Sequence, residues 1–262
     1  MNLEIIFVYQ YYRAKSSRLD AMPRQDNAAL ATPPATSRIA FVSESIRSDI
    51  LEARVAPSSR LHMAQLAERF DVSPSLVREA LSRLVADGWV KAIDQRGFRV
   101  CPVSIEDLQD ITRTRIDVES IALRRSIEAG DLAWEGRILA AYHELSGATP
   151  QRVEALKDSM MAWSVLHRRF HGALVSACNS PWLLRFRDTL TDQSERYRKL
   201  SVSYAMAPRD VDDEHKRIMQ AALDRDVDAC IAEISKHFQQ TADVVLASVQ
   251  ARLQDGDQSD AS

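Results

Sequence analysis

Leu61–Val100, with the sequence LHMAQLAERFDVSPSLVREALSRLVADGWVKAIDQRGFRV, decides the fold of the first part of this chain. Apolar residues at three- and four-residue spacing predict a short helix over Leu61–Phe70. A second helix is predicted after it, because Ser73 is a preferred N-cap residue and Pro74 is favoured in the first helical turn. Gly88 ends that second helix. Two short helices joined by a tight turn predict a helix-turn-helix.

A hairpin and a preceding helix complete this unit. Two runs rich in β-branched and aromatic residues, Trp89–Ile93 and Gly97–Val100, flank a short turn and predict the hairpin. Upstream, apolar residues at helical spacing predict an amphipathic helix that starts at Arg38: Ile39, Val42, Ile46, Ile50 and Leu51. We therefore predict a winged helix-turn-helix over residues 38–101, after a disordered tail and linker at 1–37.

The remainder of the chain has the composition of a helical protein. The whole chain contains only seven glycines, and no strand pattern follows residue 101. Six helices are predicted: 104–130, 131–145, 152–178, 182–206, one that starts at 208, and 226–253. Helices joined by short loops predict an all-helical antiparallel bundle over 102–253, followed by a disordered tail at 254–262. The predicted fold class is mainly α.

The charge distribution separates these two parts. The net charge is −3, but residues 38–100 carry +2 and residues 101–262 carry −6. A mildly basic module on an acidic body fits a DNA-reading domain attached to a domain that does not bind DNA. Three cysteines far apart and the absence of a signal peptide or a long apolar span predict a cytoplasmic protein with free thiols: Cys101, Cys178 and Cys230.

The helix-turn-helix carries candidate contacts to operator DNA. The second helix of this motif enters the major groove, and Arg78 is long enough to reach a guanine edge or a phosphate. The alternative is that its polar residues are an ordinary solvated helix face. The order of cap, helix, stop and Arg-Gly hairpin favours DNA binding. The candidate DNA-binding residues are Arg69, Ser73, Ser75, Arg78, Arg83, Arg96 and Gly97.

Residues 73–100, SPSLVREALSRLVADGWVKAIDQRGFRV, resemble the winged-helix signature of GntR-type bacterial transcription regulators. The helical remainder resembles the ligand-binding FCD domain of the FadR-like branch, so the resemblance covers residues 38 to about 250. It implies DNA contacts at Arg69, Arg78 and Gly97. Pro74 stands where many members have arginine, which puts one usual contact in doubt. Because helix-turn-helix domains of this kind bind paired half-sites in DNA, we expect a homodimer.

Four histidines form the second candidate site. His167 and His171 are four residues apart and therefore project from one face of a helix. His215 and His237 lie on two further predicted helices, each beside apolar residues that face the bundle. Imidazoles converging in a bundle suit zinc, nickel, copper or iron. From the spacing alone, a metal site and satisfied core histidines both remain open.

The FCD resemblance implies a metal held by one aspartate and three histidines. His171, His215 and His237 match the three histidines, and His167 stands where the aspartate is usual. Replacing a carboxylate by imidazole makes the site less negative and favours Zn²⁺, or Ni²⁺, over the harder Mn²⁺. We therefore predict a divalent transition metal, with zinc preferred.

Arg115 is the candidate effector-binding residue. Within its own helix, Arg115 has Glu119 four residues later, so a simple ion pair is the alternative. The resemblance implies that this arginine faces the cavity and binds a small carboxylate, a dicarboxylate or hydroxy acid, opposite the metal. Asn179 and Tyr197 are further candidates for the lining. The similarity to carbon-starvation (CsiR-like) regulators implies a glutarate-type ligand.

These features predict a ligand-responsive transcription regulator that acts as a repressor, and not an enzyme. One alternative is a metal-dependent enzyme with a histidine-rich bundle. Against it, the sequence contains no HExxH motif and no Glu-x-x-His pair of the di-iron bundles. The other alternative is a regulator whose effector binds without a metal.

Overall fold

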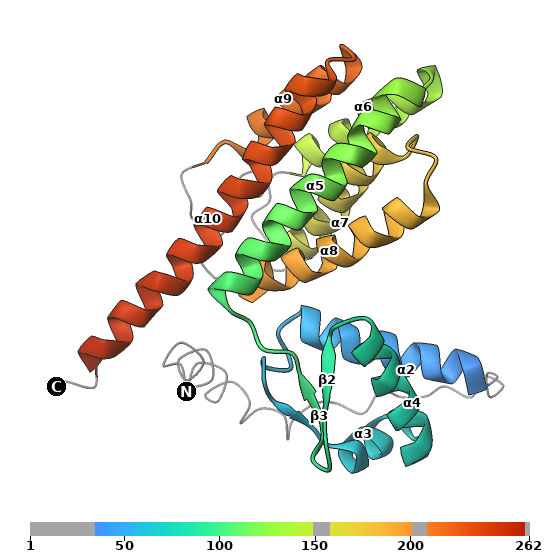
Figure 1. Ribbon diagram of the computed structural model, residues 1–262, viewed down its shortest axis with the longest axis vertical. Helices are drawn as coiled ribbons and strands as arrows, with labels where there is room; N and C mark the ends of the chain where they lie inside the picture. The colour runs from blue at the N-terminus through green and yellow to red at the C-terminus, as the bar shows by residue number, and fades with distance from the viewer. Residues whose placement is uncertain (1–34, 149–157, 201–208, 260–262) are drawn as a thin grey trace. The chain divides into compact units, whose positions relative to one another are not determined.

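The computed structural model describes residues 35–148, 158–200 and 209–259, and Figure 1 shows its helices and strands. These residues group into two compact units. The first holds the chain up to Leu108 with the ends of α8 (Pro181–Leu200) and α10 (Val227–Ser259). The second holds Gln109–Thr191, α9 (Val211–Leu223) and most of α10. Residues 1–34, predicted to be a tail, lie outside the described residues.

The core of the first unit joins α2 (Ala35–Leu51) to α4 (Pro74–Ala86). Of the predicted apolar face of α2, Ile39, Val42, Ile46 and Ile50 are buried because they recur once per helical turn, and Leu51 is partly buried. This face meets the buried face of α4, which comprises Val77, Ala80, Leu81 and Leu84. The helix α2 begins at Ala35, so 35–37 are helical and not part of the predicted linker.

The helix-turn-helix forms as predicted. The helix α3 (Met63–Phe70) ends at Asp71, which adopts a left-handed conformation with φ 50°. Ser73 then caps α4: its hydroxyl accepts a hydrogen bond from the backbone N–H of Leu76 at 3.3 Å, and Pro74 occupies the first turn. The cap fixes where the second helix starts, and therefore which side chains its exposed first turns present.

A three-stranded antiparallel sheet forms the wing, in the order β1-β3-β2. The predicted hairpin is present as β2 (Val90–Ile93) and β3 (Gly97–Val100). The third strand, β1 (Arg60–Leu61), was not predicted. Leu61, expected to open a helix, instead pairs with Phe98 and is buried beside the sheet, and α3 starts at Met63. Strand pairing with a distant segment overrides the local helical spacing there.

The second unit is built from helices in the part of the chain that the structure describes. Besides α8, α9 and α10, these are α5 (Ile105–Ala129), α6 (Leu132–Gly147) and α7 (Asp158–Val175). Their shared core contains large apolar side chains from α5, α6, α7, α9 and α10, among them Leu123, Trp134, Phe170, Ile218 and Ile234. None of the described helices is both long and apolar enough to cross a membrane.

Four predicted helix ends need correction or fall outside the described residues. The helix α7 ends at Val175 rather than Cys178, since Cys178 lies in the turn before α8. The polar tail predicted from 254 is helical as far as Ser259, where α10 ends. The predicted start of α7 at 152 and the end of α8 at 206 lie outside the described residues.

Candidate functional site

The first turns of α4 present a polar, exposed surface. Ser73, Ser75, Arg78 and Glu79 are all exposed, while the buried face of the same helix packs into the core. The hydroxyls of Ser73 and Ser75 lie 2.9 Å apart and can share a hydrogen bond. These residues occupy the part of a helix-turn-helix that meets base edges and phosphates.

Two other predicted contacts have protein partners. Arg69 donates from Nη1 to Oδ2 of Asp49 at 2.5 Å, and Arg54 donates from Nε to the other oxygen of the same carboxylate at 2.7 Å. Asp49 is only 3% exposed, so Arg69 helps to satisfy a buried charge and joins α3 to α2. Arg83 lies 3.7 Å from Glu79, one turn earlier on α4. Arg83 and Arg69 keep exposed guanidinium groups at this surface.

The wing turn depends on left-handed backbone. Gln95 has φ 54° and Gly97 has φ 85°, and Arg96 between them is exposed. No atom lies within 4 Å of the position that a Cβ on Gly97 would take. Glycine is therefore required by the backbone conformation, and the open space beside it lets another molecule approach the backbone closely.

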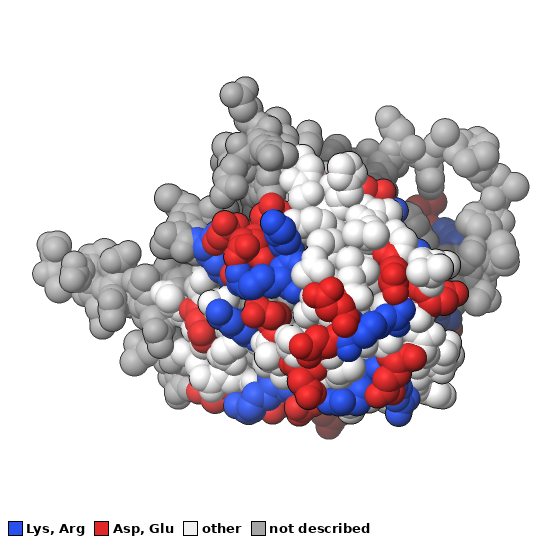
Figure 2. Space-filling model, turned by 90° about the horizontal axis from the view of Figure 1, so that it is seen from above, with Lys and Arg blue, Asp and Glu red and all other residues white. Residues whose placement is uncertain are grey.

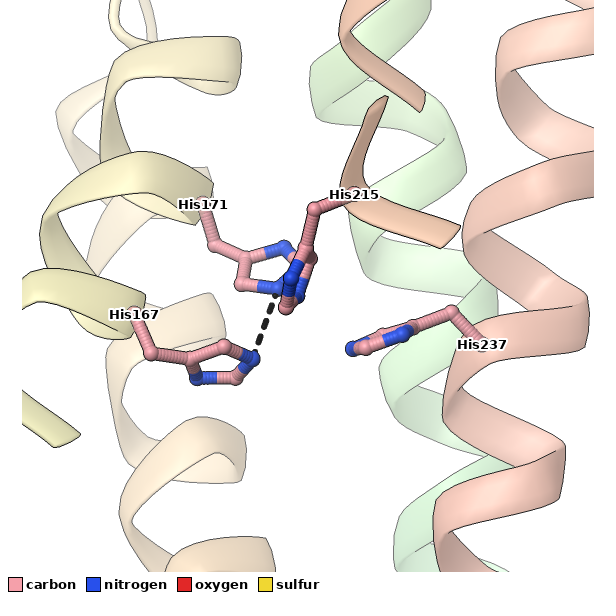
Figure 3. Close-up of side chains that lie close together, drawn as sticks. All are labelled: His167, His171, His215 and His237. Carbon is pink, nitrogen blue, oxygen red and sulfur yellow. Dashed lines mark hydrogen bonds between the residues drawn. The ribbon is translucent and has the colours of Figure 1, made fainter. Parts of the chain in front are cut away.

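Four imidazoles converge in the second unit (Figure 3). His167 and His171 come from α7, His215 from α9 and His237 from α10. One ligand nitrogen from each lies within 4.8 Å of all the others. The ring centroids of His215 and His237 are 4.7 Å apart, and those of His167 and His171 are 4.5 Å apart. The structure therefore brings together all four histidines that the sequence singled out.

The donor set fits a transition metal. A tetrahedral zinc ion about 2.0–2.1 Å from imidazole nitrogens needs those nitrogens roughly 3.3 Å apart. The Nε2 atoms of His167 and His171 lie 3.1 Å apart. Nε2 of His215 is buried and has no hydrogen-bond partner among the described residues, and the same is true of Nδ1 of His171. A bound cation would give the His215 nitrogen the partner that a buried polar atom needs.

Burial favours the neutral form of three of the imidazoles, those of His171, His215 and His237. It is the main cause that places the pKa of His171 and of His215 well below the ordinary value, and the neighbouring imidazoles lower both further. Burial also lowers the pKa of His237, while Glu214 acts in the opposite direction. Neutral imidazole is the form that binds a metal ion.

A carboxylate and an arginine support His237 from behind. Oε2 of Glu214 lies 2.8 Å from Nδ1 of His237, so Nε2 remains available to a metal. Arg209 donates from Nε to Glu214 at 2.5 Å and from Nη1 to the Thr241 hydroxyl at 2.9 Å. Burial raises the pKa of Glu214, but the hydrogen bonds from His237 and Arg209 lower this pKa to about 2. The carboxylate is therefore ionised at neutral pH.

Arg115 lies next to the histidines. It is 7% exposed, and its guanidinium carbon is 3.7 Å from the ring centroid of Phe238. That ring is 5.7 Å from the rings of both His171 and His237, and the charge of Arg115 contributes to the lowered pKa of both histidines. Glu119, the carboxylate proposed as its alternative partner, is held by Arg187 of α8, with Nε and Oε2 2.9 Å apart.

Residues 38–100 match the family described as "Bacterial regulatory proteins, gntR family", and residues 110–240 match the FCD domain. The chain belongs to the GntR family. It is 40% identical over 209 residues to the uncharacterized HTH-type transcriptional regulator BphR of Paraburkholderia xenovorans (strain LB400), and this match covers 80% of this chain and 85% of BphR. It is 32% identical over 185 residues to the HTH-type transcriptional repressor GlaR of Escherichia coli (strain K12), and this match covers 69% of this chain and 83% of GlaR.

Two solved structures share the fold of this GntR-family chain. Escherichia coli McbR/YncC has a TM-score of 0.64 and 20% identity, over 80% of this chain and 97% of that chain. A putative GntR transcriptional regulator from Rhodococcus sp. RHA1 has a TM-score of 0.65 and 21% identity, over 81% and 99%. This protein is thus a bacterial transcription regulator with a DNA-binding winged helix and an FCD domain for a small-molecule effector, and not an enzyme.

The surface charge of the GntR-family chain can be followed in Figure 2. On the face shown, Lys and Arg side chains alternate with Asp and Glu, and uncharged residues separate them. A phosphate backbone attracts a patch of one sign, so the mixed charges of this face do not make a DNA footprint.

Two residues predicted to bind the effector, Asn179 and Tyr197, have structural roles of their own. Asn179 is an exposed turn residue between α7 and α8, with φ 51°, a conformation that asparagine tolerates. The Tyr197 hydroxyl donates to Oδ2 of Asp107 at 2.5 Å and accepts from the backbone N–H of Ser104 at 3.1 Å. Both residues have a structural explanation in this GntR-family protein, and neither enters the site proposed below.

Glu214 and Arg209 were missed as site residues. The dipeptide Glu214-His215 offers a weak signal, because a carboxylate next to a ligand histidine often supports a metal site. Arg209 offers none, since its partners Glu214, His237 and Thr241 become neighbours only through the fold.

Proposed function

We propose that this GntR-family regulator is a repressor that binds operator DNA as a homodimer, and that a small carboxylate bound at a metal ion among the four histidines controls it. The observation that carries the proposal is the convergence of four buried or half-buried imidazoles beside a buried arginine. The printed name of GlaR, a repressor, supports the direction of regulation.

His167, His171, His215 and His237 would hold the ion. Four neutral imidazoles without a carboxylate suit Zn²⁺ or Ni²⁺ better than hard Mn²⁺. When bound, the ion supplies a Lewis-acid centre that a carboxylate oxygen can join. Because the donors are neutral, the charge of the ion stays uncompensated by its ligands, and this favours an anionic effector.

Arg115 is the protein group that would bind the effector's carboxylate. Its guanidinium is buried over Phe238, next to His171 and His237, where water competes little. A guanidinium fork can donate two parallel hydrogen bonds to one carboxylate, which makes the contact both strong and directional. A small dicarboxylate or hydroxy acid of the glutarate type satisfies the arginine and the metal together.

The start of α4 would read the operator. Arg78 is exposed where it can meet a guanine edge, and Ser73 and Ser75 can donate to phosphate. A homodimer would place two such helices on the two half-sites of a palindrome. An effector that binds one arrangement of the dimer more tightly changes the affinity for DNA. DNA changes the affinity for the effector by the same coupling free energy.

The metal is tested on protein purified without a histidine tag. We expect about one divalent transition metal ion per chain, and we expect His171→Ala and His215→Ala to lose it while retaining helical content. Unchanged metal content in both variants would overturn the metal site.

Effector control is tested by DNA mobility shifts with a panel of small dicarboxylates, on metal-loaded and chelator-treated protein. We expect release of DNA only from the metal-loaded protein, and loss of the response in Arg115→Ala. An equal response after chelation would favour the alternative in which the effector binds without a metal.

A further inference from the structure

A row of buried polar side chains lies between α5 and α8, continuous with Arg115. We call it the polar strip; its members are Thr112, Arg115 and Glu119 on α5, and Arg187 and Thr191 on α8. Each is at most 9% exposed. The spacing of the residues places each set on one helix face. Such inward faces of a bundle are ordinarily apolar, so a buried polar row calls for a partner.

The two helices run antiparallel along the strip. Arg187 of α8 contacts Glu119 of α5, and Tyr197, later on α8, contacts Asp107, earlier on α5. One turn forward on α8 is therefore one turn back on α5. Thr191 thus lies near the level of Arg115, whose guanidinium stacks on Phe238 beside the histidines.

Two donors of the strip, Nη2 of Arg187 and the hydroxyl of Thr191, are buried and have no hydrogen-bond partner among the described residues. Oε2 of Glu119 also has no hydrogen bond, but it is ion-paired with Nε of Arg187 at 2.9 Å. Arg187 is 3% exposed and Thr191 is 9% exposed. The strip also holds two arginines and one glutamate, and the exposed Asp188 lies 3.3 Å from Nη1 of Arg187. Buried donors without a partner call for an acceptor, and two buried arginines favour an anionic one.

We infer that the polar strip is the second anchor of the effector site, and that the far end of the effector is itself anionic. Nη2 of Arg187 and the Thr191 hydroxyl donate to this second acidic group, while the first acidic group lies at the histidines. The inference rests on the proposed function and, of the dicarboxylates and hydroxy acids named there, selects those with two acidic groups. Arg187 and Thr191 then determine specificity, because a monoanion leaves their donors unsatisfied.

The experiment compares glutarate with pentanoate, which has the same number of carbons and lacks the second carboxylate. Binding to metal-loaded protein is measured by calorimetry. Thr191→Val keeps the shape of the side chain and removes the hydroxyl. We expect it to weaken glutarate binding roughly ten- to hundredfold, the effect of losing a hydrogen bond to a charged group, and to leave pentanoate binding unchanged.

A second readout separates this role from a structural one. Removing an unsatisfied buried hydroxyl costs the empty protein nothing, so Thr191→Val keeps or raises the midpoint of thermal unfolding without ligand. Arg187→Lys keeps the charge beside Glu119 and removes the guanidinium fork. We expect it to weaken glutarate binding selectively as well.

Ser126→Ala is the matched control. Ser126 is a fully buried residue of α5 whose hydroxyl also has no partner among the described residues, but it lies two turns beyond Glu119, between the core residues Ala122 and Ile127 of the same helix. We expect unchanged glutarate affinity. If Thr191→Val and Arg187→Lys bind glutarate normally while Arg115→Ala does not, the polar strip is not an anchor and the proposed function stands. If metal-loaded wild-type protein binds a hydroxy acid but no dicarboxylate of three to six carbons, this inference fails and the proposed function stands; if it binds neither, both proposals fail.

Discussion

Glu214 accepts a hydrogen bond from Nδ1 of His237, with the two atoms 2.8 Å apart, although the residues lie on different helices. Glu214 directly precedes His215, so α9 provides one member of the histidine cluster and the group that orients another. Arg209 holds the same carboxylate from the other side. The arrangement fixes the tautomer of His237 with Nε2 free to meet a cation.

Glu214→Gln should weaken metal binding by about ten- to a hundredfold, because a ligand histidine loses the carboxylate that orients it and raises its basicity. Glutamine has the same shape, so helical content should be retained. The measurement is competition for Zn²⁺ or Ni²⁺ against a chelator of known affinity.

Glu233→Gln is the matched control for this change. Glu233 lies on α10, one turn before His237, and pairs with the partly exposed Arg217 rather than with a histidine. We expect its metal affinity to stay within about twofold of wild type, since exposed ion pairs contribute little. Equal metal affinity in Glu214→Gln and Glu233→Gln would show that Glu214 does not support the site.

His167→Asp should change which metal the cluster prefers. A carboxylate oxygen is a harder donor than imidazole, and it lowers the net charge of the site by one. We expect the affinity for Mn²⁺ to rise relative to that for Zn²⁺, measured by competition of both ions on the same protein. An unchanged preference would indicate that His167, which also stacks on Trp163 with ring centroids 4.6 Å apart, is not a ligand.

The helix-turn-helix could be predicted because its signals are local. The N-cap at Ser73, the proline after it and the glycine at residue 88 act within a few residues of the helix ends that they set. The pair His167 and His171 was equally visible, since four residues of helix bring two side chains to one face. Such features can be read from the sequence because the residues that determine them are close neighbours in the chain.

The parts that escaped prediction depend on distant contacts. The strand β1 has only two residues and exists through its pairing with β3. Glu214 and His237 are 23 residues apart, and Glu119 and Arg187 are 68 apart. Arg115 and Glu119 have the spacing of an ion pair within one helix, yet Arg187 holds that carboxylate. Local spacing shows which side chains share a helix face, but not which helix packs against that face.

Arg69 and Arg78 should behave differently although both are candidate DNA contacts. Arg69→Ala removes one of the two arginines from the buried carboxylate of Asp49 and should lower the free energy of unfolding by about 1–2 kcal/mol. Arg78→Ala should leave stability within about 0.5 kcal/mol and reduce discrimination at one base pair by about 1–3 kcal/mol. Urea unfolding and DNA titrations measure the two effects.

Arg137→Ala serves as the reference for these arginines, because Arg137 is an exposed residue of α6. It should change neither stability nor DNA affinity. Intact operator affinity and specificity in Arg78→Ala would remove α4 from the role of the reading helix.

Gly97→Ala should destabilise the wing through its backbone alone. Gly97 has φ 85°, which costs an L-residue about 1–2 kcal/mol, and no atom lies within 4 Å of the added Cβ. Gln95→Gly is the opposite change in the same turn, since it relieves a non-glycine residue at φ 54° and should not lower stability. Neither substitution alters the charge. DNA affinity of Gly97→Ala is measured under conditions where the protein remains folded, so a weaker affinity would come from the wing backbone at the DNA. Unchanged stability of Gly97→Ala would contradict the requirement for glycine.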